Sequence, residues 1–390
     1  MKYDIVVIGA GIQGAGVAQA AAAAGYSVLV VEQTAPAAGT SSKSSKLIHG
    51  GLRYLETAQF GLVRESLHER ALLLRLAPEL VKLRPLHIPL YEDSTRSPLT
   101  IRAGLSLYSL LAGLNKDSLF TQLGRDNWSS LTGLRQDKLK AVFRYYEAQT
   151  DDAALTRSVL QSAVILGADL LMPARFVGAE RNGQCCKVDI ETAKGHESIS
   201  CRVLVNCAGP WAGDVLARIT PALSSPSIEL VQGSHLLLPP VLDQYFYLEA
   251  PQDKRAVFVL PWEGRLLVGT TEKVHKDAPE KATCSPEERD YLLATLRHYF
   301  PNLVLPEAGA VETMAGLRVL PRSDKNAFAR PREVMFAVDD EARPRVLSIM
   351  GGKLTTYRAT AQEAMLRLAP SLPTKERRAD TALVSLIPVD

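Results

Sequence analysis

The sequence predicts a mixed α/β protein in which a helix-covered parallel sheet is combined with a second, mainly antiparallel sheet. At 3–31, two short segments rich in β-branched residues enclose an Ala-rich segment, a pattern typical of a βαβ unit. Further along, segments at 228–238, 245–249, 256–260 and 265–270 have strand composition and are separated by turns. Strands that follow one another without helices favour an antiparallel arrangement. The expected fold class is therefore α/β, with a second part of α+β type.

Length and composition bound the possible functions. The chain has 390 residues, which suggests two or three domains or one large discontinuous fold. Hydrophobic residues make up 46% and charged residues 22%, which is typical of a soluble globular protein. The net charge of +3 is too small to indicate a nucleic-acid partner. The five cysteines include no CxxC pair, so we expect reduced structural thiols in a cytoplasmic protein and no metal site.

One long apolar run needs its own explanation. No charged side chain occurs from Ile5 to Val31, and this length alone would permit a membrane span or a signal sequence. The run nevertheless contains five glycines together with Gln13 and Gln19, and only Lys2 precedes it. A buried βαβ unit explains these residues better than a membrane anchor does.

The glycines of this run form a nucleotide-binding motif. Gly9, Gly11 and Gly14 fit G-x-G-x-x-G, directly after the first strand and at the start of a helix expected at 12–24. They permit a tight turn, close approach of a pyrophosphate and close packing of helix on strand, while the helix N-terminus attracts phosphate. Glu32 lies 18 residues after Gly14, where a carboxylate can accept hydrogen bonds from ribose hydroxyls. The unit predicts Rossmann-like nucleotide binding but leaves FAD and NAD open.

The segment that follows, 39–55, reads GTSSKSSKLIHGGLRYL. Its small polar residues can surround phosphate and ribose, and the glycines at 50–51 let the backbone approach a flat ring. Arg53 can bind a phosphate or carboxylate through two hydrogen bonds, and Tyr54 can add a hydroxyl. The alternative interpretation is a solvated loop with an ordinary surface arginine.

Periodicity and capping residues place further helices. The expected helices are at 60–76, at about 153–166 and at 286–299. Ser285 and Glu288 form a capping box, and Pro286 suits the first helical position, so the start of the helix at 286–299 is well marked.

Two further apolar segments complete the expected elements. The stretch 101–114 is too short to span a bilayer, so it is either a helix packed on the core or a patch that contacts a membrane surface. Residues 346–350 are expected to form the last buried strand, after which the glycines at 351–352 open a final helix that runs to about Ala369.

Several segments resemble those of one enzyme family. SSKLIHGGLRYLE at 44–56 closely resembles a segment of FAD-dependent glycerol-3-phosphate dehydrogenases, which belong to the D-amino-acid-oxidase-like flavoprotein superfamily. Further similar segments follow in the family's order and extend the resemblance over about 3–360: AGPWAGDV at 208–215, QGSH at 232–235, VFVLPWEGRLLVGTTE at 257–272, AGLRVL at 315–320 and GGKLTTYR at 351–358.

The resemblance implies a Rossmann-like FAD-binding domain with an interleaved antiparallel-sheet substrate domain. The expected FAD-binding segments are 1–85, 150–220 and 310–370, and the expected substrate-domain segments are 86–149 and 221–310. Residues 371–390 are expected to form a C-terminal tail. Typical members of the family continue into a separate helical C-terminal domain, which we expect this chain to lack.

The resemblance also implies FAD as the cofactor. The residues expected to contact it are Gly9, Gly11, Gly14, Glu32, Thr40, Ser41, Ser45, Lys46, Leu47, His49, Gly209, Gly352, Lys353, Leu354 and Thr355. We expect the backbone N–H groups of 352–355, at the start of the final helix, to face the N1–C2=O edge of the flavin and to stabilise its reduced form.

The implied reaction is oxidation of sn-glycerol 3-phosphate at C2 to dihydroxyacetone phosphate, with a hydride passing to flavin N5 and the electrons passing on to a quinone or another acceptor. The expected substrate-binding residues are Arg53, Tyr54 and Arg332, and the expected catalytic residues are His235, Arg318 and Lys353. His235 is our first choice as general base. The alternative is that His235 orients the substrate while Arg318 or Lys353 stabilises the alkoxide.

Two departures from the family pattern leave other functions open. Glu272 stands where the family commonly has Asp, and 321–332 are divergent, both near the expected site. The alternatives are a related FAD oxidoreductase of another hydroxy acid or an amino acid, or a non-catalytic FAD-binding subunit or sensor. Retention of Arg53, His235, Arg318 and Lys353 together argues against the last of these.

The same reasoning defines the expected partners. They are a small phosphorylated substrate and an electron acceptor, either a quinone or a protein, but no nucleic acid. We expect a cytoplasmic protein, with at most peripheral contact at the inner face of the cytoplasmic membrane.

Overall fold

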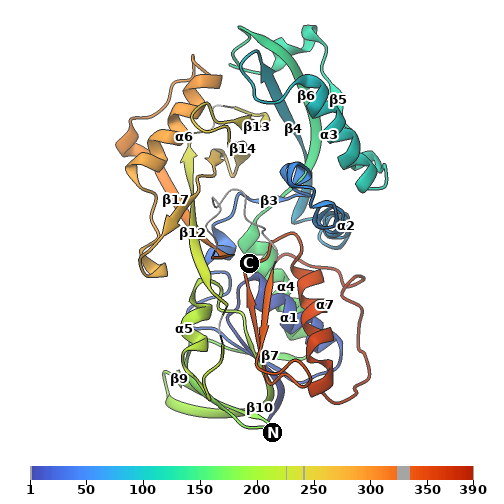
Figure 1. Cartoon of the computed structure of the whole chain (residues 1–390), viewed down its shortest axis with the longest axis vertical. Coiled ribbons are helices and arrows are strands. Elements are labelled where there is room, and N and C mark those ends of the chain that lie inside the picture. The colour runs from blue at the N-terminus through green and yellow to red at the C-terminus, as the bar shows by residue number, and fades with distance from the viewer. Residues whose placement is uncertain (1, 225, 240–241, 323–333, 390) are drawn as a thin grey trace.

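The computed structural model describes residues 2–224, 226–239, 242–322 and 334–389. In these residues two large sheets lie toward opposite ends of an elongated molecule (Figure 1). The helices of the described residues are α1 (Ile12–Ala23), α2 (Phe60–Leu76), α3 (Pro98–Leu111), α4 (Asp152–Ile165), α5 (Ala212–Leu216), α6 (Pro286–Tyr299) and α7 (Tyr357–Leu368). The predicted α/β class is confirmed.

The first sheet has the strand order β11-β8-β9-β10-β1-β2-β7, and β19 and β18 extend it from β10. Its strands are β1 (Tyr3–Ile8), β2 (Val28–Val31), β7 (Ala168–Leu171), β8 (Ala174–Arg181), β9 (Cys186–Thr192), β10 (Gly195–Asn206), β11 (Ile219–Thr220), β18 (Met335–Val338) and β19 (Val346–Met350). Strands β10, β1, β2 and β7 are parallel, and α1, α4 and α7 cover one face of them.

The βαβ unit formed by β1, α1 and β2 is confirmed, and it is fully buried. Nearly every residue of α1 is buried, which its small alanine side chains permit, so that α4 and α7 pack directly against it. The third glycine of the motif makes the helix approach the first strand very closely. A Cβ atom at Gly14 would lie 1.9 Å from the carbonyl oxygen of Gly9.

The second sheet has the order β16-β12-β15-β14-β13-β4-β6-β3, with β17 paired to β12 and β5 to β6. Its strands are β3 (Leu47–Ile48), β4 (Val81–Tyr91), β5 (Thr121–Gln122), β6 (Leu139–Thr150), β12 (Ile228–Leu238), β13 (Tyr245–Glu249), β14 (Ala256–Trp262), β15 (Arg265–Gly269), β16 (Lys273–His275) and β17 (Glu312–Pro321). Strands β12 to β17 pair antiparallel with their neighbours in this group, as predicted.

Strand β17 belongs to this second sheet, whereas 310–370 were expected in the FAD-binding part. The reason is a continuous antiparallel pairing with β12 that runs from Ile228 opposite Pro321 to Leu237 opposite Glu312. Strand β17 therefore places Arg318 on the second sheet.

The expectation that a helix opens at Gly352 is wrong. Gly351 and Gly352 have φ values of +77° and +85°, in the left-handed region, and they turn the chain away from β19. Helix α7 begins only at Tyr357. Lys353, Leu354 and Thr355 consequently lie in a loop before the helix, and not in its first turn.

Helix α3 packs on the second sheet through one of its faces. Ile101, Leu105 and Tyr108 are buried in the cluster that also contains β4 and β6 residues. Leu99 and Leu110 remain 76% and 60% exposed on the other side. Among the described helices, none is long and apolar enough to cross a membrane.

The residues after α7 run back along the helical face of the first sheet. The N–H of Arg378 donates to the carbonyl of Ala23 at 2.7 Å, and the N–H of Leu386 donates to the carbonyl of Leu76 at 2.7 Å. Near its end, the tail carbonyl of Ile387 accepts a hydrogen bond from Ser158 in α4 at 2.5 Å. These contacts bind the tail to α1, α2 and α4.

We predict that Gly14→Ala strongly destabilises the protein, because the new methyl group would collide with the backbone of Gly9 and force α1 off β1. The expected loss in the free energy of unfolding is about 3 kcal/mol, with weaker retention of FAD. Gly61→Ala in α2 is the matched control, since a Cβ there meets nothing within 4 Å. Denaturant unfolding measures both; equal stability of the two variants would contradict the prediction.

Candidate active site

A cavity of about 880 Å³ lies where the two sheets meet. Of the expected site residues, those that line it are Gly9, Gly11, Glu32, Thr40, Ser41, Ser45, Leu47, His49, Arg53, Tyr54, Gly209, His235, Arg318, Gly352, Lys353, Leu354 and Thr355. Gly14 and Lys46 lie behind its wall. Arg332 lies outside the described residues.

The nucleotide end of the cavity is formed by the loop between β1 and α1. Gly9 has a φ of +99°, and a Cβ there would lie 2.8 Å from the carbonyl oxygen of Cys207, so only glycine fits. The carboxylate of Glu32 accepts hydrogen bonds from the N–H of Ala10 at 2.8 Å and from the N–H of Thr34 at 2.9 Å. Its orientation is thus fixed by one backbone group after β1 and one after β2.

The segment after β2 is tied to both sheets. Ser41 Oγ accepts a hydrogen bond from the N–H of Ile12 at 2.9 Å, so this hydroxyl caps the start of α1. Thr40 Oγ1 donates to the carbonyl of Leu317 in β17 at 2.9 Å. Both residues therefore shape the cavity through their own hydrogen bonds to the backbone of other elements.

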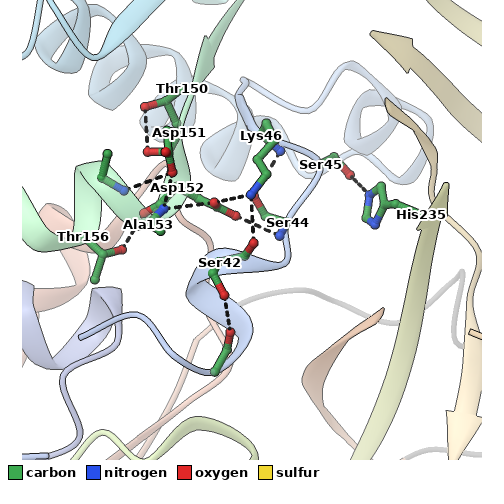
Figure 2. A network of polar contacts seen from close by, with 12 residues as sticks. Ser42, Ser44, Ser45, Lys46, Thr150, Asp151, Asp152, Ala153, Thr156 and His235 are labelled. Carbon is green, nitrogen blue, oxygen red and sulfur yellow. Dashed lines mark hydrogen bonds and ion pairs between the residues drawn. The ribbon is translucent and has the colours of Figure 1, made fainter. Parts of the chain in front are cut away.

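Lys46 acts from behind this segment (Figure 2). Its Nζ lies 2.5 Å from Asp152 Oδ1 and donates to the carbonyl of Ser42 at 2.8 Å, and both charged side chains are almost completely buried. Asp152 Oδ2 also accepts from the N–H of Ser44 at 2.8 Å. The ion pair therefore fixes the loop that carries Ser45 into the cavity.

His235 lies on β12 and faces this loop (Figure 2). Its Nε2 lies 2.8 Å from Ser45 Oγ, and the residue is 2% exposed. Burial, together with the positive charges of Arg318 and Lys46, lowers the pKa of His235 to about 3. The imidazole is therefore neutral at neutral pH.

Arg318 reaches the cavity from the neighbouring strand β17. Its Nη2 donates to Thr270 Oγ1 at 3.2 Å, and its Nη1 lies 3.9 Å from Glu272 Oε1. Glu272 Oε2 lies 3.6 Å from Arg255 Nη1, so one buried carboxylate stands between two guanidinium groups. A Cβ at Gly233 would lie 2.5 Å from Arg318 Nη2, so glycine is needed where the side chain crosses β12.

Two cations lie against the ring of Tyr54. Lys353 Nζ is 4.0 Å from the ring centroid and donates to Ser66 Oγ at 3.2 Å, and Arg53 Cζ is 5.9 Å from the same centroid. Gly51, with a φ of +79°, allows this ring to approach, because a Cβ there would lie 2.3 Å from the ring. Tyr54 thus joins Arg53 and Lys353 in one cluster.

The remaining wall offers polar atoms to a flat ring. Thr355 Oγ1 accepts from the N–H of His49 at 3.1 Å, which joins the 352–355 loop to the 39–55 segment. Gln13 Oε1 is buried at the cavity and has no hydrogen-bond partner among the described residues. A Cβ at Gly352 would lie 2.6 Å from Gln13 Nε2. Glycines on both sides and an unsatisfied buried oxygen fit a bound dinucleotide with a ring system.

Comparison with known proteins agrees with this geometry. Residues 4–358 match the family model described as "FAD dependent oxidoreductase". The chain belongs to this family of FAD-dependent oxidoreductases. FAD is therefore its cofactor, and its substrate is a small molecule.

Several proteins similar to this oxidoreductase are named as dehydrogenases of phosphorylated alcohols. It is 38% identical to a glycerol-3-phosphate dehydrogenase of Pseudomonas aeruginosa, over 94% of this chain and 72% of that protein. It is 35% identical to a D-erythritol 1-phosphate dehydrogenase of Brucella abortus, over 95% of this chain and 74% of that protein. Among solved structures, the glycerol-3-phosphate dehydrogenase of Bacillus halodurans complexed with FAD superposes with a TM-score of 0.75 at 28% identity, over 99% of this chain and 68% of that chain.

Sequence reasoning missed several residues of this FAD-dependent oxidoreductase. Arg255 and Glu147 line the cavity, and Glu288 is buried just behind it. No clear signal in the sequence marked Glu147, because its strand, β6, also contains the charged residues Lys140 and Arg144. Arg255 had no signal beyond its place before a strand, and Glu288 was recognised only as a capping residue. All three depend on contacts between distant segments.

We predict that Lys46→Met lowers the free energy of unfolding by about 3–5 kcal/mol, because the buried carboxylate of Asp152 would lose its cation. Arg265→Met is the matched control. Its partner Glu312 is also 2.5 Å away, but that pair is exposed, so the expected loss is below about 1 kcal/mol. Denaturant unfolding at neutral pH decides; similar losses in the two variants would refute the argument.

A second prediction concerns pH and stability. Because folding lowers the pKa of His235 to about 3, the unfolded chain binds this proton more readily between about pH 6.5 and 3. Acidification through this range therefore destabilises the wild type by about 1.4 kcal/mol per pH unit through this residue. His235→Gln removes that contribution, so its unfolding free energy should fall less steeply from pH 6 to 4. Parallel curves for the two proteins would show that the imidazole is not held neutral.

Proposed function

We propose that this chain oxidises sn-glycerol 3-phosphate at C2 to dihydroxyacetone phosphate. The observation that carries the proposal is the convergence of Arg53, Arg318 and Lys353 on one cavity with Tyr54 and the neutral His235. Three cations and one base are what a phosphorylated secondary alcohol requires. The 37–38% identity to proteins named glycerol-3-phosphate dehydrogenase supports this choice.

In this proposal the cations bind the phosphate group. A phosphate dianion matches guanidinium groups in geometry and an ammonium group in charge. Arg318 is oriented in advance by Thr270 and Glu272, and Lys353 by Ser66. Pre-oriented charges lose little entropy when the substrate binds, so they contribute to affinity as well as to position.

His235 takes the proton of the C2 hydroxyl. With its proton on Nδ1, the imidazole accepts through Nε2, and Ser45 Oγ donates to that atom in the absence of substrate. A substrate hydroxyl beside Ser45 then transfers its proton to Nε2. The phosphate offsets the charge of Arg318, and this raises the proton affinity of the imidazole when the substrate is bound. FAD supplies the two-electron oxidant.

The two sheets divide these tasks in our proposal. The first sheet, with the β1–α1 loop and Glu32, holds the cofactor, and the second sheet, with β12 and β17, presents His235 and Arg318 to the substrate. The electrons finally leave to a quinone or another acceptor. We also propose a cytoplasmic protein with at most peripheral membrane contact, for which the exposed leucines of α3 are a suitable surface.

D-erythritol 1-phosphate is a second candidate substrate. The Brucella abortus relative named for it is 35% identical to this chain, close to the identity of the glycerol-3-phosphate dehydrogenases. Both molecules carry a phosphate and at least one secondary hydroxyl, so the same cations and base would serve either. Glu272, in place of the aspartate that is common in glycerol-3-phosphate dehydrogenases, is a local difference near this part of the site.

We predict that sn-glycerol 3-phosphate bleaches the flavin absorbance of the FAD-loaded protein under anaerobic conditions, whereas glycerol does not, because it lacks the phosphate. The panel also contains D-erythritol 1-phosphate, a hydroxy acid and an amino acid, and it is monitored by stopped-flow spectroscopy. Faster reduction by another member of the panel would reassign the substrate. Bound flavin that no member reduces would favour a non-catalytic FAD-binding role.

A further inference from the structure

The carboxylate of Glu288 lies in the wall behind the cavity. Glu288 is the third residue of α6 and is buried, although it is acidic. Its Oε1 accepts hydrogen bonds from Thr271 Oγ1 at 2.5 Å and from Ser234 Oγ at 2.9 Å. Its Oε2 accepts from Gln232 Nε2 at 2.7 Å and from the N–H of Ser285 at 3.1 Å. Within the described part of the chain, no cation pairs with it.

Two of these donors lie on the back of the strand that carries His235. Side chains alternate between the faces of a strand, and Gly233 and His235 of β12 line the cavity. Gln232 and Ser234 therefore point the other way, toward α6, where both bind Glu288. The carboxylate thus holds the segment of β12 that carries His235 by its far face.

A third donor extends this hold to the neighbouring segment. Beyond Gly269, which is paired with His235, the ladder between β12 and β15 ends. Beyond that point Thr271 binds β12 instead of the ladder. The Oγ1 of Thr271 accepts from the N–H of Ser234 at 2.9 Å, and the N–H of Thr271 donates to the carbonyl of Ser234 at 3.3 Å. The same hydroxyl donates to Glu288. Thr270, which binds Arg318, is adjacent in sequence.

We propose that Glu288 is a positioning residue that fixes His235 for proton transfer. A buried carboxylate without a cation depends on its hydrogen-bond donors. Each donor that moves away leaves part of the charge unsolvated, which costs free energy, so the donors are held in place. A shift of β12 would weaken the hydrogen bonds from Gln232 and Ser234 at the same time. The inference rests on the proposed function for the role of His235, but the position of the imidazole can be tested without a substrate.

The capping role of Glu288 can be separated from this positioning role. In the capping box, Ser285 Oγ accepts from the N–H of Glu288 at 3.4 Å, and the carboxylate accepts from the N–H of Ser285. Ser285→Ala removes the first bond and leaves all four donors to the carboxylate. Glu288→Gln keeps the shape of the side chain but has only one accepting oxygen. Its NH₂ meets either the N–H donors of Gln232 and Ser285, or the hydroxyls of Ser234 and Thr271, which must then turn to accept and no longer donate.

The test compares wild type, Glu288→Gln and Ser285→Ala as FAD-loaded proteins at a temperature at which all are folded. The first measurement is modification of His235 by diethyl pyrocarbonate without substrate, followed by peptide mass spectrometry. We expect labelling at least threefold faster than wild type in Glu288→Gln and an unaltered rate in Ser285→Ala. Labelling of Glu288→Gln at the wild-type rate, or equal acceleration in Ser285→Ala, would overturn the proposal.

The second measurement is anaerobic flavin reduction by sn-glycerol 3-phosphate. We expect the rate constant at saturation to fall at least tenfold in Glu288→Gln, with less than a threefold change in the half-saturating concentration, and to stay within twofold of wild type in Ser285→Ala. A loss confined to the half-saturating concentration, or a rate constant within twofold of wild type in Glu288→Gln, would also overturn the proposal.

The design separates failure of this inference from failure of the proposed function. If sn-glycerol 3-phosphate does not reduce wild type, the proposed function fails while the labelling still decides the position of His235. If Glu288→Gln does not fold, Ser234→Ala takes its place, because it removes one donor and keeps the backbone bonds to Thr271. At least twofold faster labelling is then expected, and labelling at the wild-type rate would overturn the proposal.

Discussion

The cavity depends on buried carboxylates that hold its wall in place. Asp152 binds Lys46 beneath the loop that carries Ser45. Glu147 accepts from Arg70 at 2.6 Å and from the N–H of Gly50 at 3.4 Å, beside the Tyr54 cluster. Since each of these charges is costly to leave unsolvated, each one restricts the donors around it to few positions. A wall built in this way is arranged before any ligand arrives, which is the condition for electrostatic catalysis.

Much of the fold follows from local patterns, and these were readable from the sequence. Strand β12, helix α2 and the capped helix α6 have the predicted bounds, because alternation, helical periodicity and a capping box depend only on neighbouring residues. The sheet to which β17 belongs was not readable, since its ladder with β12 joins residues far apart in the chain. The predicted start of α7 was wrong for another reason. The two glycines at 351–352 suggested the opening of a helix in the sequence, but their positive φ values turn the chain instead.

The site was readable where a motif carries its own chemistry. Glycines that approach a phosphate, an acid after the second strand, and a histidine beside glycine and serine all reached the cavity wall. The supporting roles were not readable. Lys46 was expected to contact the cofactor but lies behind the wall, paired with Asp152, and Glu288 was recognised only as a helix cap, because these roles depend on partners in distant segments. Nothing in the sequence near 288 shows that a helix cap also binds β12. Contacts of this kind require the tertiary structure.

Charge around His235 links substrate binding to proton transfer. Arg318 both lowers the pKa of the imidazole and, in our proposal, binds the phosphate. An empty site therefore keeps His235 neutral and a poor proton acceptor, so that it does not become charged beside Arg318 and Lys46. In the same proposal, a bound phosphate dianion would cancel part of that field and so raise the proton affinity of the imidazole. An alcohol without a phosphate would leave the field intact, so the same arginine that binds the correct substrate also disfavours deprotonation of the wrong one.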